Sequence, residues 1–300
     1  MTVVRADRSL GIADRLHWYA EGPLLLVFAL VTQLGDVWFL FALGGALYAA
    51  GTGRSRLAVD RRRGLFVLAL AFTYVALVGV LKPVFALPRP PGAGTAPLPR
   101  WLPAALSVLY ENAATATGSG FPSGHALGST MVWGGVALVL NGSRRARAGL
   151  AGAIVAAVSL SRLVLGVHYV VDVIAGAALG VVVLLSCYRL ADGGTEPGRV
   201  LRLAVAIGVA GLVVGVTFDT ATAIGGPLGA WLAWRGVGAS VPEYAATHRE
   251  AIGSVAALTV VGGAFGGLYL LQPSAPIAFA GSAVVGAGVV GAPLAGSRLA

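Results

Sequence analysis

Long apolar runs recur along the whole chain and are separated by short polar segments. Runs of about 18 or more apolar residues have the length of a transmembrane helix, whereas a transmembrane barrel needs short strands of alternating polarity. The runs here are rich in Ala, Leu and Gly and do not alternate, so the pattern predicts an all-α polytopic membrane protein. The predicted spans are 23–50, 64–81, 123–140, 148–165, 170–188, 200–217, 251–271 and 275–297.

Two stretches do not fit a simple span. Gln33, Gly35 and Asp36 interrupt the first run, which is either one tilted helix or a short interfacial segment followed by a span that starts near Leu34. The apolar piece 223–236 is too short for a span and is expected to be re-entrant or interfacial.

Composition supports the membrane class and excludes others. The chain is 57% hydrophobic and 11% charged, whereas soluble domains carry about 25% charged residues. The net charge is +9, but the basic residues lie in short loops and are not interleaved with aromatics on a water-facing element, so no nucleic-acid partner is expected. The single cysteine, Cys187, has no partner for an internal disulfide and is expected to be a small core residue.

Arginine-rich loops set the orientation. If the spans simply alternate, the three basic connections fall on one side, which the positive-inside rule makes cytoplasmic. The connections from the second to the third span and from the fourth to the fifth then face outward. We therefore expect a multi-pass protein of the cell membrane. The basic residues concerned are Arg54, Arg56, Arg61, Arg62, Arg63, Arg144, Arg145, Arg147, Arg189, Arg199 and Arg202.

The first outward connection begins with the only lysine of the chain, Lys82, which is followed by Arg89 and Pro90. A helix from Gly64 to Leu81 is about 27 Å long, close to the hydrocarbon thickness, so Lys82 is predicted at the outer interface. Prolines from Pro83 onward are expected to end that helix. A lysine that merely snorkels to the interface is the plainer interpretation.

The second polar cluster is "GSGFPSGHALGS", residues 118–129, at the predicted start of the third span. A helix start offers unpaired N–H groups and a partial positive charge, which suit a phosphate. Ser123 and Gly124 would supply such contacts, and His125 lies in the first turn. A simple helix cap explains Ser123 equally well but leaves His125 unexplained.

The third cluster is "SRLVLGVHYVVD", with Arg162, His168 and Asp172. His168 and Asp172 are four residues apart and would meet on one helical face if the fifth helix begins by His168. A carboxylate bonded to one ring nitrogen leaves the other as a base or nucleophile. A metal site is the rival use of such a pair, but it would want three or four ligands.

The three clusters together place three cations, two histidines and a carboxylate on the outward face. Fixed cations and helix-start amides around two histidines describe a phosphate site with its own nucleophile and acid. The residues alone do not decide which histidine attacks. We expect neither a metal nor another cofactor.

The three motifs resemble the signature of the type 2 phosphatidic acid phosphatase (PAP2) superfamily. They are Lys82-x6-Arg89-Pro90, then Pro122-Ser123-Gly124-His125, then Ser161-Arg162-x5-His168-x3-Asp172. The resemblance covers about residues 34–190 and extends to the sixth span. It implies a six-helix transmembrane core, which we place in residues 1–217. Residues 218–300 are then a C-terminal extension of about two further transmembrane helices.

The resemblance also implies hydrolysis of a lipid phosphate or diphosphate monoester through a phosphohistidine, on the extracytoplasmic side. His168 would be the nucleophile, Asp172 its orienting partner and His125 the acid, while the phosphate would be bound by Lys82, Arg89, Ser123, Gly124 and Arg162. Candidate substrates are phosphatidate-like lipids, phosphatidylglycerol phosphate-like lipids and polyprenyl diphosphates. The oligomeric state stays open.

Two alternatives to hydrolysis remain. A phosphotransferase would use the same phosphoenzyme with a lipid or sugar hydroxyl in place of water. A transporter without chemistry would carry its charges at mid-membrane depth, whereas these charges lie at the ends of spans; Asp36 and the piece 223–236 keep that alternative open.

Overall fold

The computed structural model describes residues 23–51, 59–96 and 101–299, and every regular element in these ranges is a helix. The predicted all-α class is confirmed. The elements are α3 Pro23–Thr32, η1 Gln33–Gly35, α4 Val37–Ala50, α5 Arg61–Phe85, α6 Ala104–Ala114, α7 Gly124–Val139, α8 Arg144–Val164, α9 Val170–Leu190, α10 Pro197–Ala210, η2 Gly211–Val214, α11 Phe218–Val237, η3 Gly238–Ser240, α12 His248–Leu271 and α13 Ala275–Leu299.

Six of the described helices are long and apolar enough to cross a membrane, and a seventh span results if the broken pair α3–α4 is counted as one. The six are α5, α8, α9, α10 with η2, α12 and α13. Helix α7, predicted as a span, is 16 residues long and falls below that length. The polytopic membrane class is nonetheless confirmed.

The interruption in the first run is a bend. Helix α3 ends at Thr32, one 3₁₀ turn follows, and α4 leaves at 49° to α3. Asp36 has extended backbone angles (φ −76°, ψ 150°), so it cannot continue either helix and stands as the N-cap of α4. A single tilted helix is therefore wrong, and the chain forms a broken helix.

Helix α5 is longer than the sequence predicts. It continues through Pro83 and ends at Ala86, which adopts a left-handed conformation (φ 47°). Proline was expected to stop the helix, but its fixed φ is helical, and in the last turn it forfeits only one hydrogen bond. Lys82 thus lies inside the final turn of α5 rather than beyond it.

Residues 223–236 lie within the 20-residue helix α11, which is not among the candidate spans, so the interfacial or re-entrant placement stays a prediction. The glycines of this segment are close-packing positions and not breaks in the helix. A Cβ added at Gly225 or Gly229 would collide with the backbone of α13 at Phe279 or Ala283. Small residues at such contacts let helix backbones approach closely in membranes.

Helix α6 is an element that the hydropathy pattern missed. It lies in the connection between α5 and α7, shortly after the exposed Trp101. Its eleven residues are too few to span a membrane, so span-length hydropathy is blind to it.

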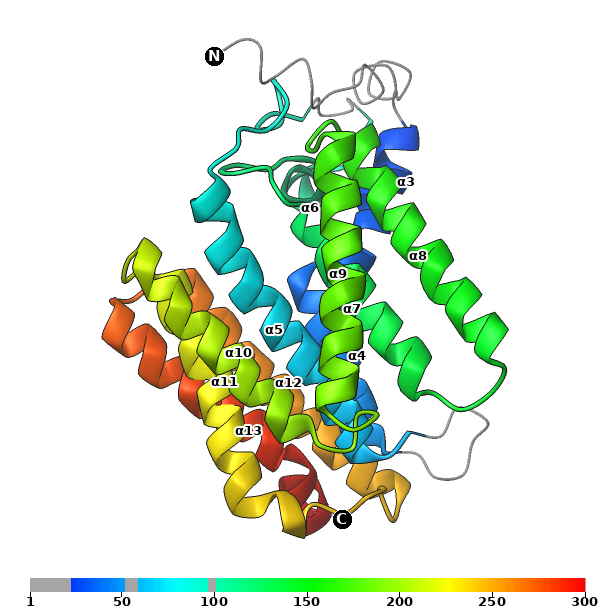
Figure 1. Cartoon of the computed structure of the whole chain (residues 1–300), viewed down its shortest axis with the longest axis vertical. Coiled ribbons are helices and arrows are strands. Elements are labelled where there is room, and N and C mark those ends of the chain that lie inside the picture. Colours follow the sequence, from blue (N-terminus) through cyan, green and yellow to red (C-terminus); the bar gives the residue numbers. More distant parts are fainter. Residues whose placement is uncertain (1–22, 52–58, 97–100, 300) are drawn as a thin grey trace.

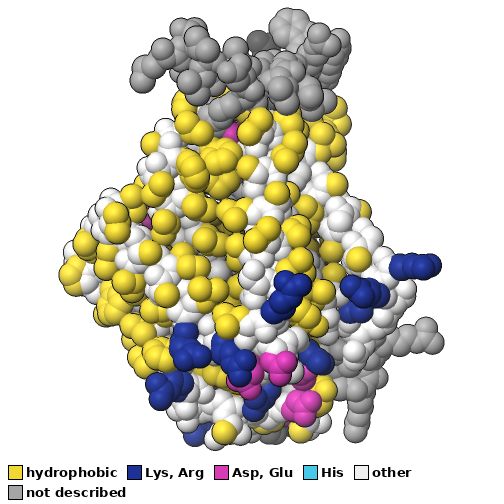
Figure 2. Space-filling model, viewed as in Figure 1, with side chains coloured by type: hydrophobic (Ala, Val, Ile, Leu, Met, Phe, Trp, Pro, Cys, Tyr) yellow, Lys and Arg dark blue, Asp and Glu magenta, His cyan; other side chains and the backbone are white. Residues whose placement is uncertain are grey.

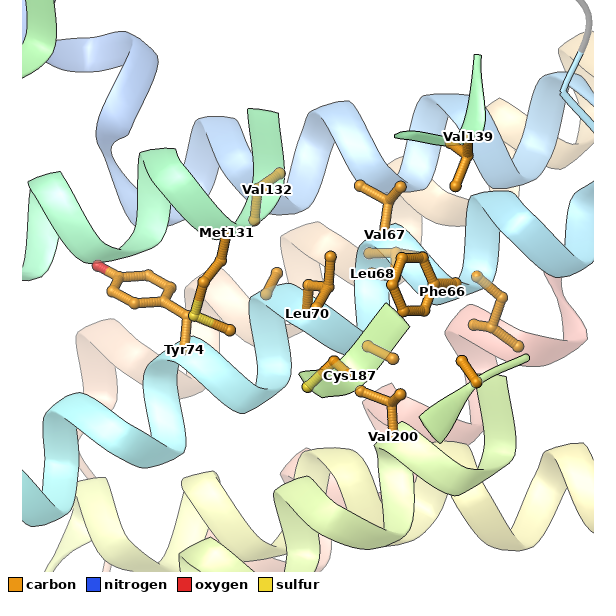
Figure 3. Packing of buried hydrophobic residues seen from close by; sticks show 14 of the residues in the cluster. Phe66, Val67, Leu68, Leu70, Tyr74, Met131, Val132, Val139, Cys187 and Val200 are labelled. Atoms are coloured by element: carbon orange, nitrogen blue, oxygen red, sulfur yellow. The ribbon is translucent and has the colours of Figure 1, made fainter. Parts of the chain in front are cut away.

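Helix α5 runs through the middle of the molecule, with α4, α7, α8 and α9 on one side and α10–α13 gathered on the other (Figure 1). Buried side chains from α5, α7, α9 and α10 meet in one apolar core, including Phe66, Leu70, Met131 and Cys187 (Figure 3). Cys187 is buried and unpaired, as expected of a core residue.

Charge is distributed unevenly between the two ends. Lys and Arg side chains gather at the lower end of the view in Figure 2, while apolar side chains cover most of the rest of that face. Helix α8 runs from its arginine-rich start at that end to Arg162 at the other (Figure 1). Arg54 and Arg56, which we counted among the basic loops, lie outside the described residues.

Candidate active site

The turn between α8 and α9 brings two of the predicted motif positions together. Gly166 adopts a left-handed conformation (φ 68°) that ends α8. The amide of Val167 donates to the carbonyl of Arg162 (3.2 Å) and that of Gly166 to the carbonyl of Leu163 (3.0 Å), which is the Schellman pattern. Glycine is favoured at this position because other residues pay a steric cost there. The chain then reverses, and His168 follows directly.

His168 and Asp172 are in contact, but not in the way we predicted. Helix α9 begins at Val170, so His168 precedes the helix and the pair does not share a helical face. Asp172 lies in the first turn and reaches back, accepting a hydrogen bond from the amide of Tyr169 (3.0 Å). The same oxygen, Oδ2, lies 3.4 Å from Nδ1 of His168. Helix capping therefore places this carboxylate against the ring.

The other ring nitrogen of His168 meets Arg89. Arg89 Nη1 lies 3.0 Å from His168 Nε2 and also donates to the carbonyl of Val167 (2.8 Å), while Nε donates to the carbonyl of Thr117 (3.0 Å). A guanidinium has no acceptor, so Nε2 must accept and Nδ1 carries the proton toward Asp172. The imidazole is thereby held as one tautomer, with its lone pair on Nε2.

Charge and burial reinforce that state. The pKa of His168 lies well below its usual 6.5, first because the ring is buried and then because Arg89, Arg162 and Lys82 are near; a hydrogen bond with the backbone of Gly120 opposes this in part. The imidazole is consequently neutral at neutral pH. Burial also lowers the pKa of Arg89, although Asp172 works in the opposite direction.

The two remaining cations approach from α5 and α8. Arg162 is buried and is held by Thr32 Oγ1 (2.8 Å) and by the carbonyl of Ala113 (3.2 Å). Lys82 is half-buried in the last turn of α5 and is close enough to interact electrostatically with Arg89 and Arg162. The structure thus brings together the three cations that the sequence predicted.

The second motif forms the start of α7, as predicted. Ser123 is the N-cap and is fully buried, and its Oγ accepts from the amide of Ala126 (3.4 Å). Its amide donates to the carbonyl of Asp172 (2.9 Å), which joins the starts of α7 and α9. Gly124 opens the helix and His125 follows in the first turn. The capping geometry of Ser123 agrees with the plainer interpretation of that serine.

Asp36 is a site residue that we did not predict. Its Oδ2 lies 4.0 Å from Nε2 of His125, across the interface between the α3–α4 bend and α7. The sequence held a signal, a carboxylate interrupting an apolar run, but nothing in the pattern indicated that it faces His125. Within the part of the chain that the structure describes, no three His, Cys, Asp or Glu side chains converge as a metal site would require.

The comparison with protein families matches residues 64–195 to the model described as the PAP2 superfamily. The match contains all three motifs, whereas Asp36 and α10–α13 lie outside it. No curated protein and no solved structure matches the chain significantly. The family match and the apolar spans together show a PAP2-superfamily region in residues 64–195, consistent with the membrane-embedded branch of a superfamily whose members are generally phosphatases.

Proposed function

We propose that this protein hydrolyses a lipid phosphate or diphosphate monoester through a phosphohistidine on His168. The observation that carries the proposal is the ring of His168 held between Asp172 at Nδ1 and Arg89 at Nε2, beside two further cations. A neutral imidazole with its lone pair on an oriented nitrogen is the form a nucleophile requires.

Arriving phosphate would replace His168 as the acceptor for Arg89. The guanidinium can then bind phosphoryl oxygens with charge-assisted hydrogen bonds, together with Lys82 and Arg162. The start of α7, with the Gly124 amide and the Ser123 side chain, would add its partial positive charge. Nε2 of His168 is thereby released and faces the phosphorus atom.

The first chemical step forms the bond between Nε2 and phosphorus and breaks the bond from phosphorus to the leaving oxygen. That oxygen takes a proton from His125, while Asp172 stabilises the positive charge that develops on the ring of His168. In the second step, water loses a proton to His125 and attacks phosphorus. The bond to Nε2 breaks, and inorganic phosphate leaves.

Apolar side chains near the site support a membrane-borne substrate. Val84 and Phe85, in the turn that also holds Lys82, are 61% and 46% exposed, and Trp38, two residues after Asp36, is 59% exposed. In a chain that spans a membrane, such side chains face lipid, so the ester can reach the cations with its tail in the bilayer. The site lies at the end opposite the arginine-rich loops, which supports an extracytoplasmic location.

The test is phosphate release by the purified protein in detergent with a chelator present. The three candidate substrates are a phosphatidate, a phosphatidylglycerol phosphate and a polyprenyl diphosphate. We expect release from at least one of them, a loss of about 10³-fold or more in His168→Ala, and a radiolabelled phosphoenzyme that survives alkali.

The matched control is His248→Ala, which removes an exposed histidine at the start of α12, remote from the three motifs. Unchanged phosphate release in His168→Ala would sink the proposal. Adding an acceptor alcohol identifies transfer, because a phosphorylated alcohol then appears at the expense of free phosphate.

A further inference from the structure

We propose that Asp36 is a positioning residue for His125, whose carboxylate holds the imidazole in the protonated form that donates to the leaving oxygen. The inference rests on the proposed function and deepens it, because it assigns the charge partner of the acid. Asp36 lies outside residues 64–195, so it belongs to a part of the chain that the family match leaves out.

The geometry points to an interaction that the protonated ring would complete. Nε2 of His125 is buried and has no hydrogen-bond partner among the described residues. It lies 4.0 Å from Oδ2 of Asp36, longer than a hydrogen bond by about 1 Å. A proton on that nitrogen would draw the carboxylate in, whereas a neutral ring gives it little reason to move.

The bend that carries Asp36 is fixed to the site at several points. Arg162 donates to Thr32 Oγ1 (2.8 Å), and Trp133 Nε1 donates to the carbonyl of Leu34 (2.9 Å). Gly35 lies flat against α7 and α8, since a Cβ there would be 2.5 Å from Val158 Cγ1 and 3.5 Å from His125 Cδ2. The carboxylate is therefore delivered by a packed element.

His125 needs such a partner because burial, above all, and its other charged neighbours oppose protonation. The neighbours that act on it are Arg162 from α8, His168 from the turn before α9, Lys82 from α5 and Arg89 from the loop after α5. The neutral phenol of Tyr74, on α5, packs below it against Gly124 and Gly128. Positive charges disfavour a second positive charge on the ring, and a carboxylate counters them.

Capping α4 does not account for Asp36. Burial is the largest influence on the Asp36 carboxyl and favours its neutral form, whereas the amides of Val37 and Trp38 and the cation of Arg162 favour the ionised form. The side chain forms no cap hydrogen bond. About a third of the side chain is exposed, which leaves it a route for exchanging protons with water.

The leaving group separates this role from a structural one. An alkyl ester leaves poorly and depends on the acid, which is worth about 10²–10⁴-fold, whereas a p-nitrophenyl ester leaves without it. In Asp36→Asn we expect the rate of phosphoenzyme formation from an alkyl phosphate to fall by about 10²-fold, while the rate from p-nitrophenyl phosphate changes by less than about threefold. This first step is compared because the later attack by water is common to both esters. The alkaline limb of the rate from the alkyl ester should also move to lower pH.

Two control variants separate the effect of this carboxylate from that of any carboxylate. Asp219→Asn removes a carboxylate at the start of α11 and should change neither ester, while Asp36→Glu keeps the charge and should recover part of the alkyl activity. Thermal unfolding in detergent reports folding of each variant. An Asp36→Asn protein that is unchanged on the alkyl ester, or equally impaired on both esters, overturns the inference, as does Asp36→Glu without recovery.

The failure of the proposed function has a different signature. A wild-type protein that hydrolyses neither ester, or a His168→Ala variant that equals it, overturns the phosphatase itself and the inference with it. If the wild type is active and Asp36→Asn leaves its activity on the alkyl ester unchanged, only the inference about Asp36 is overturned.

Discussion

Helix α5 joins two charge clusters that differ in how their charges are balanced. At its start, Arg61 is fully buried and donates to Glu250 Oε1 (2.8 Å) and to the carbonyl of Ala49 (3.2 Å). At its end, Lys82 stands with Arg89 and Arg162. The first cluster is an internally neutralised pair, whereas the second gathers cations around a neutral histidine.

The difference suits the first cluster to stabilising the fold and the second to binding an anion. Glu250 also accepts a hydrogen bond from the amide of Ala246 (2.8 Å) and lies in the first turn of α12. The Arg61–Glu250 ion pair therefore links the C-terminal helices to α4 and α5. The cluster of Lys82, Arg89 and Arg162 instead has unbalanced positive charge, which can bind an anion. Both clusters contain a buried arginine, Arg61 in one and Arg162 in the other, so a buried cation by itself does not distinguish them; the balance of charge does.

The largest expected effect is the loss of stability when the Arg61–Glu250 ion pair is broken. Glu250→Ala leaves the guanidinium of Arg61 buried without its counter-ion, which typically costs about 3–5 kcal/mol. We expect a much lower thermal midpoint in detergent. Phosphate release per folded molecule should stay at the wild-type level, because the site lies at the other end of α5.

An apolar replacement of both partners sharpens the same contrast. Arg61→Met combined with Glu250→Leu should recover most of the lost stability, since a well-packed apolar pair often equals a buried ion pair. If Glu250→Ala left stability unchanged but abolished activity, the division between the two clusters would be wrong.

A smaller effect, on kcat/KM, is expected when Lys82 in the cluster with Arg89 and Arg162 is exchanged for arginine. Lysine is a compact point charge on a flexible stem, whereas arginine is a wide planar fork, and Arg89 and Arg162 already occupy the site. Lys82→Arg should lower kcat/KM by about tenfold, equivalent to about 1.4 kcal/mol, with an unchanged thermal midpoint. Full activity in that variant would show that any cation serves there.

The smallest effect concerns pH. Because the pKa of His168 lies below 6.5, kcat/KM should fall only as the solution becomes more acidic than that and the nucleophile takes up a proton. Arg89→Gln removes a neighbouring cation, so the pKa of His168 rises and the acid limb should move to higher pH by about one unit.

The comparison uses the shape of the pH profile, because we expect Arg89→Gln also to weaken phosphate binding and so to lower the whole curve. Ionisation of the substrate is common to both proteins and cancels in the comparison. An acid limb at the same pH in both would contradict the assigned role of the surrounding cations.

Several features were predictable because they depend on short-range pattern. Runs of apolar residues indicate membrane helices whatever the rest of the chain contains. The three motifs likewise carry their residue types at a fixed spacing. The start of α7 at Ser123 followed from its glycines and capping serine. The division into residues 1–217 and 218–300 remains a prediction.

Two departures from the sequence pattern have different physical causes. The apolar piece 223–236 looked short, yet it lies in a longer helix whose Gly225 and Gly229 permit close contact with α13. Pro83 looked like a terminus, yet α5 tolerates it in its last turn. Packing between helices far apart in the chain accounts for the first, whereas the helical φ of proline and its place in the last turn account for the second.

The order of apolar and polar residues is enough to show that this protein is helical, that it lies in a membrane and which residue types its candidate site contains. Three contacts became visible only in the folded chain, namely Asp172 with His168 through helix capping, Asp36 with His125, and Arg61 with Glu250. Hydrophobicity is a property of each segment and is written locally. Which charge meets which across the fold depends on how helices pack, and residues 36 and 125, or 61 and 250, carry no local trace of their partner.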